Sequence, residues 1–297
     1  MKRLFITLTF IVLSISNALG DNFSFTAVCS SGQTLYCKMY EQGAMVTYPN
    51  QLYASDNYYY NYTEPTGDLV IPDTVVYGVK KYPVIRIDHN AFRKCSGLTS
   101  VMIPNTVTSI GFLAFCDCSN LKSVTISNAV TNISDLFINC TNLISVDIPN
   151  SVIEIGDNTF NGCSSLKTIN IPNSVQTISQ TAFLDCENLQ YNEYDNALYL
   201  GNNENKYLWL MKAKSTDITS CEININCKYI ADKAFEGCNK ISSINIPNSV
   251  IYIGGSAFKD CGSLSIVNIP SSVTKIMNGA FSECNGLSLV SIPNAVI

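Results

Sequence analysis

Apolar residues recur in fixed columns with a period of about 23 residues over most of this chain of 297 residues. The unit reads C-x-x-L-x-x-V-x-I-P-x-x-V-x-x-I-G-x-x-A-F, and most of the intervening positions are polar. Such self-similarity predicts a solenoid, because one short unit cannot bury its own apolar face and stacked units can. The cysteine column of the repeat consists of Cys95, Cys118, Cys140, Cys163, Cys186, Cys238, Cys261 and Cys284.

Each unit predicts two different halves. The segment L-x-x-V-x-I ends in strict alternation, which predicts a short strand with Val and Ile pointing inward. The proline that follows ends this strand because it has no backbone donor. The half V-x-x-I-G-x-x-A-F mixes three- and four-residue spacings, which favours a bend, a short second strand and a tight helical turn.

The repeat is interrupted between Cys186 and Cys238, where a degenerate unit and an insertion fill the gap. Counting back 23 residues places Cys221 and Cys227 in columns that hold valine elsewhere, so both are predicted to be small buried hydrophobes. Two insertions, "VVYGVKKYPVI" near 74–84 and "NALYLGNNENKYLWLMKA" within 190–213, predict β-hairpins.

The chain ahead of the repeats divides into two parts. Residues 1–20 have a short cationic start, an apolar run of twelve residues and small residues near Gly20, the features of a cleaved signal peptide. Residues 21–66 alternate like strands and then become tyrosine-rich, which predicts a small N-terminal β cap and a connection. The repeat domain then covers residues 67–297.

The strings "CSGLTSVMIPNTVTSIGFLAF", "CSSLKTINIPNSVQTISQTAF" and "CGSLSIVNIPSSVTKIMNGAF" resemble the BspA-like (Treponema pallidum-type) class of leucine-rich repeat. The resemblance implies a leucine-rich-repeat solenoid of the β-rich α/β class: a curved stack of repeats with one parallel sheet, preceded by the β cap. It also implies an exported surface protein that binds other proteins, such as host matrix proteins or proteins of neighbouring cells. Ligands differ widely within this class, so the resemblance does not identify one here.

Charge and chemistry narrow the function further. The net charge is -5 and no basic stripe is present outside the first three residues, which argues against nucleic-acid binding. The chain has one histidine, His89, and no recognised catalytic, phosphate-binding or calcium-binding motif. We therefore expect no catalytic residues, no cofactor and no metal, and a protein that is not an enzyme.

The cysteine column leaves several readings open: a metal site, vertical disulfides, nucleophiles or a packed core. Zinc sites usually show paired C-x-x-C spacing, which is absent. Nucleophilic thiols need an activating base, and one histidine cannot serve the eight thiols of the column. Buried thiols in a core ladder are the favoured reading. Cys29 and Cys37 differ, because a hairpin centred near Gln33 would make them cross-strand neighbours, and a disulfide between them is a hypothesis.

The outward strand positions, on the concave side of a curved stack, are the predicted site for a partner protein. A merely solvated face, a structural scaffold or spacer without a ligand, and a glycan-binding accessory module are the alternatives. Aromatics of the second hairpin and a tyrosine cluster (Tyr53, Tyr58, Tyr59, Tyr60 and Tyr62) are alternative hot spots, and packing against the flank of the solenoid is the other interpretation of both groups. The predicted face residues are Ser123, Thr125, Ser145, Asp147, Thr168, Asn170, Ser243, Asn245 and Asn268, and the hairpin aromatics are Tyr199, Tyr207 and Trp209.

Localisation and assembly follow from the two ends of the sequence. A cleaved signal and no later apolar run of eighteen residues predict a secreted or cell-surface protein without membrane insertion after cleavage. The sequence stops at "SIPNAVI", partway through a unit. We expect such an uncapped repeat to expose an apolar edge, which either pairs with another molecule or marks a truncated product.

Overall fold

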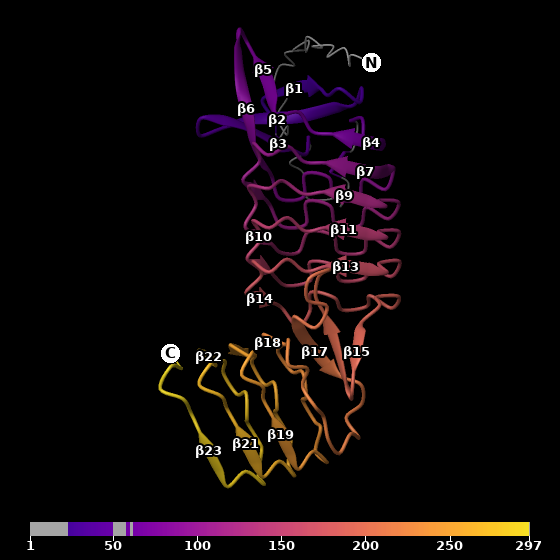
Figure 1. Ribbon diagram of the computed structural model, residues 1–297. Helices are drawn as coiled ribbons and strands as arrows, with labels where there is room; N and C mark the ends of the chain where they lie inside the picture. The colour runs from indigo at the N-terminus through magenta and orange to yellow at the C-terminus, as the bar shows by residue number, and fades with distance from the viewer. Residues whose placement is uncertain (1–22, 50–57, 60–61, 297) are drawn as a thin grey trace, which may run out of the picture. The chain divides into compact units, whose positions relative to one another are not determined.

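The computed structural model describes residues 23–49, 58–59 and 62–296. The predicted signal peptide, residues 1–20, lies outside this part of the chain. The chain forms two compact units (Figure 1): the first comprises residues 1–168, 174–177 and 181–189, and the second comprises residues 169–173, 178–180 and 190–297. Each unit is described by itself below.

The first unit begins with a six-stranded sheet in the order β1-β2-β3-β6-β5, with β8 also pairing with β6. Strands β1 (Phe25–Val28), β2 (Thr34–Tyr40) and β3 (Gly43–Thr47) are antiparallel neighbours, and β3 then pairs in parallel with β6 (Lys80–Ile87). Strand β5 (Thr74–Tyr77) forms an antiparallel hairpin with β6. Because β6 also pairs in parallel with β8 (Ser109–Ile110), this N-terminal sheet continues directly into the repeats.

The repeats of the first unit form two ladders of short parallel strands (Figure 1). One ladder contains β4 (Gly67–Val70), β7 (Leu98–Met102), β9 (Ser123–Thr125), β11 (Ser145–Asp147) and β13 (Thr168–Asn170), and only the first residue of β13 belongs to this unit. The other contains the two-residue strands β10 (Asn132–Ile133), β12 (Glu154–Ile155) and β14 (Thr177–Ile178).

This arrangement differs in two ways from the expectation of one parallel sheet and a helical turn. In the first unit the short second strands β10, β12 and β14 pair with one another and so build a second ladder. The A-F segment is a turn, and no helix occurs among the described residues. Alternate backbone donors of this segment bond to the next repeat, as Phe92 N–H does to the Ala114 carbonyl at 2.8 Å, so they are not available for bonds along a continuous helix.

The second unit combines a hairpin with further repeats. Strands β15 (Asn192–Tyr194), β16 (Ala197–Leu200) and β17 (Trp209–Ala213) are antiparallel neighbours. Strand β17 then pairs in parallel with β18 (Tyr229–Ile230), which is followed by β20 (Tyr252–Ile253) and β22 (Lys275–Ile276). The second ladder of this unit contains β19 (Ser243–Asn245), β21 (Ile266–Asn268) and β23 (Leu289–Ser291).

The core of each unit is a set of columns in which equivalent side chains stack. Phe115 and Phe137 illustrate the phenylalanine column: their ring centroids are 5.7 Å apart and their planes differ by 17°. In the second unit Phe235 and Phe258 stack in the same way at 5.2 Å. The prediction for the degenerate unit is confirmed, because Cys221 and Cys227 are both buried. Each repeat therefore buries its apolar face only against its neighbours, as a solenoid requires.

Candidate interaction face

The outward face of the β9 and β11 strands is formed by small polar side chains. In each strand the central valine, Val124 or Val146, is buried and the two flanking residues are exposed. The exposed residues Ser123, Thr125, Ser145 and Asp147 are four of the predicted face residues. Parallel pairing places Ser145 beside Ser123 and Asp147 beside Thr125, so equivalent residues form straight columns across the strands.

A groove of about 350 Å³ runs along one border of this face. Its walls come from the strand ends and from the turns that follow them, and two of the predicted residues, Thr125 and Asp147, line it. Ser127 takes the place of the proline that starts this turn in neighbouring repeats, and its buried hydroxyl donates to the Val107 carbonyl at 2.6 Å. The principal lining residues are Met102, Pro104, Thr125, Asn128, Asp147 and Pro149.

One carboxylate near the other end of this ladder is held in its ionised form. Asp68 accepts hydrogen bonds from the hydroxyls of Ser100 at 2.7 Å and Thr99 at 2.8 Å. These bonds, with Ser100 contributing most, lower the pKa of Asp68 below its ordinary value. In this repeat, both positions before the inward Val101 therefore reach the exposed side on which the Asp68 carboxylate lies.

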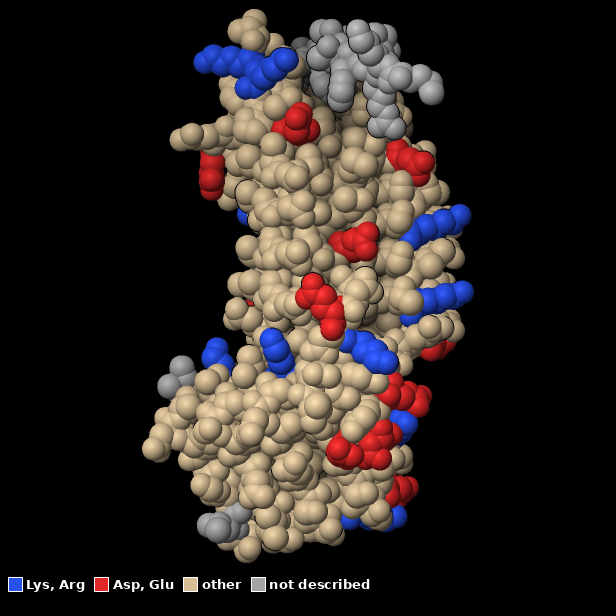
Figure 2. Space-filling view, viewed as in Figure 1, with Lys and Arg blue, Asp and Glu red and all other residues tan. Residues whose placement is uncertain are grey.

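The remaining predicted face residues are also exposed. Thr168 extends the face of the first unit, whereas Asn170 belongs to the second unit. In the second unit Ser243 and Asn245 flank a buried isoleucine on β19, and Asn268 pairs with Asn245. Charged side chains are sparse on the molecular surface seen in Figure 2, where most atoms are tan.

The prediction of exposed aromatic hot spots in the second hairpin is wrong for two of the three residues. Tyr199 is 0% exposed and Trp209 is 1% exposed. Tyr199 accepts a hydrogen bond from the Asn224 N–H, and the Trp209 ring stacks on Tyr229 at 4.4 Å. The reason is that β17 continues the sheet of β18, so this hairpin is part of the solenoid wall. Tyr207 is half-buried against Tyr199 and packs on the core of the unit.

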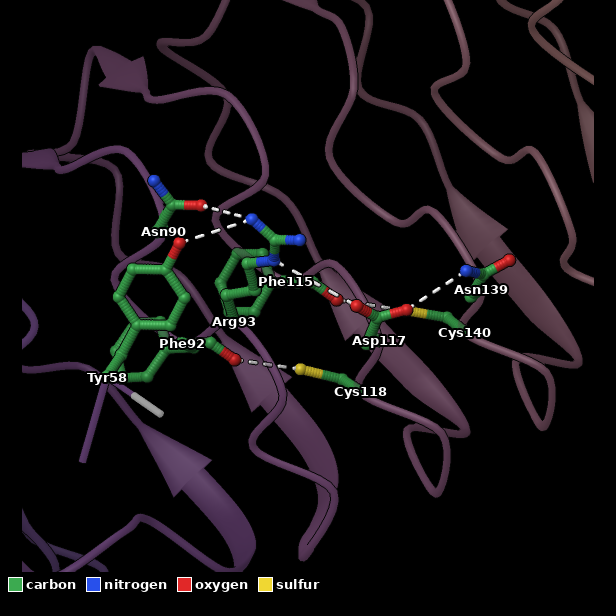
Figure 3. A network of polar contacts seen from close by, with 9 residues as sticks. All are labelled: Tyr58, Asn90, Phe92, Arg93, Phe115, Asp117, Cys118, Asn139 and Cys140. Carbon is green, nitrogen blue, oxygen red and sulfur yellow. Dashed lines mark hydrogen bonds and ion pairs between the residues drawn. The ribbon is translucent and has the colours of Figure 1, made fainter. Parts of the chain in front are cut away.

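The tyrosine cluster ahead of the repeats also packs inward where it is described. Tyr59 is buried, and its hydroxyl donates to the Ala91 carbonyl at 2.6 Å. Tyr58 is half-buried, and its hydroxyl accepts a hydrogen bond from Arg93 (Figure 3). Tyr62 packs edge-on against Tyr36. Tyr53 and Tyr60 lie outside the described residues.

The predicted pairing of Cys29 with Cys37 also differs from the structure, in which both thiols are free. The register of β1 and β2 places Cys37 opposite Phe25, and the Cys29 N–H donates to the Gln33 carbonyl at the turn. The two cysteines are thus offset by four residues along the hairpin, or about 13 Å at about 3.3 Å per residue. This offset exceeds the Cα separation of about 7 Å that a disulfide can bridge.

The cysteine column is a ladder of buried hydrogen-bond donors, shown for two repeats in Figure 3. The Cys118 thiol donates to the Phe92 carbonyl, and the Cys140 thiol donates to the Phe115 carbonyl, both at 3.1 Å. Burial raises the pKa of both thiols well above its ordinary value, which suppresses the nucleophilic thiolate. The same bond to a phenylalanine carbonyl is made by Cys163, Cys186, Cys261 and Cys284.

The polar network at the edge of this ladder joins successive turns. Arg93 donates to the Tyr58 hydroxyl at 3.2 Å and approaches the Asp117 carboxylate at 3.9 Å (Figure 3). Asp117 accepts a hydrogen bond at 2.9 Å from Asn139 of the following repeat. Asp117 and Asn139 both have a positive φ, at 61° and 57°, in which short polar side chains are favoured over apolar ones. This network is explained by turn geometry and inter-repeat bonding.

Two features of the described residues bear on metal binding and on membrane insertion. Within residues 23–49, 58–59 and 62–296, no three His, Cys, Asp or Glu side chains are grouped in a way that could hold a metal ion. In the same part of the chain, no helix has the length and apolar character needed to cross a membrane.

The repeats match the family model described as the BspA type leucine rich repeat region, with six copies over residues 85–204 and 213–297. The chain belongs to the BspA-type leucine-rich repeat family. The match covers more than half of the chain and, in the first unit, includes every strand of the two ladders except β4. Leucine-rich repeats of this kind are typical of protein-interaction scaffolds rather than of enzymes.

Solved structures with the same repeats come from several bacteria. The Treponema pallidum leucine-rich repeat protein is 23% identical to this chain, with a TM-score of 0.48, over 77% of this chain and 87% of that chain. A leucine-rich cell surface protein from Faecalibacterium prausnitzii is 25% identical, with a TM-score of 0.39, over 96% and 85%. A leucine-rich repeat protein from Bacteroides ovatus is 21% identical, with a TM-score of 0.37, over 89% and 88%. No curated protein matches the chain.

Proposed function

We propose that this BspA-type protein is an exported, non-enzymatic adhesion module, secreted or held at the cell surface, that binds a partner protein. Residues 1–20 would direct export and be removed in the process. The contact surface would be the outward face of the first unit, centred on β9 and β11. The observation that carries the proposal is the groove bordered by Thr125 and Asp147, which adjoins the exposed side chains of Ser123 and Ser145.

The chemistry of this face suits a protein ligand. Small hydroxyls bring little steric bulk and offer both donors and acceptors, so a partner backbone can approach the sheet closely. The half-exposed Met102 and the prolines of the groove supply apolar contact area next to them. Extended surfaces that repeat the same column from strand to strand are the usual binding surfaces of solenoids.

The test is a double substitution, Thr125→Arg with Asp147→Arg, which places two long cations in the groove. Wild type and variant are immobilised, and saturable capture from host and microbial cell-surface protein extracts is quantified by mass spectrometry. We expect the variant to lose most of the captured protein. The matched control is Thr177→Arg with Glu154→Arg, which makes the same charge change at exposed positions of the other ladder. Equal capture by all three proteins would show that the face is solvated surface and the protein a spacer.

A further inference from the structure

In the first unit, Ser123 and Ser145 form one column across the strands, and Thr125 and Asp147 form a second. A third column lies next to the serine column, on the side away from Thr125 and Asp147. Thr99, Lys122, Ile144 and Lys167 occupy the same position in four successive repeats. Their backbones are hydrogen-bonded in series: Lys122 N–H donates to Thr99 at 2.9 Å, Ile144 N–H to Lys122 at 3.2 Å, and Lys167 N–H to Ile144 at 3.2 Å. The column is therefore a straight extension of the strand ladder, and its two cations have equivalent backbone positions.

Neither lysine of this column forms an ion pair with a described residue. Lys122 and Lys167 are exposed, and no described acidic side chain lies within ion-pair distance of either. Several other lysines are paired, among them Lys214 with Glu193 and Lys240 with Asp217. The column itself contains no acidic residue. In a chain of net charge -5, two aligned and unpaired cations form a local positive border on the proposed face.

The opposite border of the face carries negative charge. The groove side carries the exposed Asp147, with Met102 52% exposed two strands away. Between the borders lie the hydroxyls of Ser123 and Ser145. A ligand lying on these hydroxyls would therefore meet cations on one side and a carboxylate beside an apolar groove on the other.

We propose that the partner segment bound by this face is an acidic, extended polypeptide that runs across the strands along the stacking direction. Its carboxylates pair with Lys122 and Lys167, and its backbone lies on the hydroxyl column. This assignment rests on the proposed function and adds the chemical class and direction of the ligand.

The spacing of the lysines selects the conformation of that segment. Lys122 and Lys167 are two strands apart, which is about 9.4–9.8 Å at the usual separation of neighbouring strands. A polyproline II segment presents the same side every three residues, or about 9.3 Å. A β-strand presents the same side every two residues, or about 6.6–6.8 Å, and falls out of step with the lysines. Carboxylates at i and i+3 of a polyproline II segment therefore match the column.

The apolar member of the column favours a polypeptide over a polyanionic glycan. Ile144 stands between the two lysines and is 48% exposed. A polypeptide can place an apolar or proline side chain over Ile144 between two carboxylates, which removes apolar surface from water. A highly charged glycan would leave this side chain without an apolar partner.

The test uses synthetic peptides of identical composition. One repeats Glu-Pro-Pro five times and so places every carboxylate on one side of a polyproline II helix. The other repeats Glu-Pro five times and ends in five prolines, which spreads the same five carboxylates around the helix. Binding to the full chain is measured by fluorescence anisotropy at about 25 and about 150 mM salt. We expect the Glu-Pro-Pro peptide to bind at least about fivefold more tightly than its isomer. Its affinity should fall at the higher salt concentration, because salt screens the exposed ion pairs.

The variant Lys122→Glu with Lys167→Glu should lower the affinity for the Glu-Pro-Pro peptide by about tenfold or more, because two attractive charge pairs become repulsive ones. The matched control is Lys80→Glu with Lys81→Glu, on the β5–β6 hairpin, where both lysines are exposed and lack a described ion-pair partner. It changes the net charge equally and should leave binding within about twofold. Equal losses in both variants, equal affinity for the two peptides, or no binding would each overturn the assignment.

The outcome is separable from that of the proposed function. If the peptides fail while Thr125→Arg with Asp147→Arg still abolishes capture from cell-surface extracts, the face binds a protein of different chemistry. If the peptides and the extract experiment both fail, the face is not an interaction surface.

Discussion

The thiol ladder predicts a measurable stability difference between two buried cysteines. Cys140 and Cys37 are both 0% exposed, and replacing either by alanine removes one buried sulfur atom. The Cys140 thiol donates to the Phe115 carbonyl at 3.1 Å. For Cys37, no hydrogen bond from the thiol to any described residue is present, and burial alone raises its pKa to about 12. Cys37→Ala is therefore a control for burial without the bond.

The magnitudes follow from the two contributions. Loss of the buried sulfur costs about 1 kcal/mol, close to the value for one buried methylene, and an unfilled cavity adds to it. Loss of a weak hydrogen bond costs about 0.5–1 kcal/mol. The Phe115 carbonyl keeps the bond from the Cys118 N–H at 3.3 Å, so it is not left without a donor and the larger desolvation penalty does not apply. We expect about 1 kcal/mol for Cys37→Ala and about 1.5–2 kcal/mol for Cys140→Ala.

The assay is urea unfolding followed by circular dichroism, with the free energy of unfolding obtained by linear extrapolation. Cys163→Ala serves as a replicate of Cys140→Ala, because Cys163 is also fully buried and donates to the Phe137 carbonyl at 3.1 Å. The reasoning is refuted if Cys37→Ala costs as much as the two ladder variants. That result would mean that packing alone stabilises the cysteine column and that the thiol hydrogen bonds contribute nothing to the free energy of unfolding.

Two further outcomes are expected. Under native conditions iodoacetamide should leave the thirteen thiols unmodified over hours, and after denaturation it should alkylate them all. The reason is that every cysteine is buried, and burial raises the pKa of thiols such as Cys221 and Cys261 to about 12. Rapid labelling of the native protein would contradict this expectation. Asp68→Asn should remove stability that is present above about pH 4 and lost as the pH falls through the lowered pKa of Asp68. Unfolding curves of both proteins from pH 3 to pH 6 check the sign, and a gap that widens toward low pH would contradict it.

The repeat columns were predictable residue by residue, whereas the sites between repeats were not. Val124 and Val146 are inward because alternation along one strand decides it, and Cys221 was correctly placed in a valine column by counting alone. Trp209 and Tyr199 were misjudged because their exposure depends on which strand the hairpin pairs with. Cys29 and Cys37 were misjudged because the turn sets the register, and a shift of a few residues separates them.

Sequence alone determined the period, the inward columns and hence a solenoid of BspA-type repeats, because these depend on the local spacing of apolar residues, which is the same in each repeat. Only the tertiary structure decided that the second halves form a ladder of their own, that the A-F turns bond between repeats, and that Lys122 and Lys167 stand in one column beside Ser123 and Ser145. The physical reason is that hydrogen bonds and columns join residues about 23 positions apart, and their alignment exists only after the repeats have stacked.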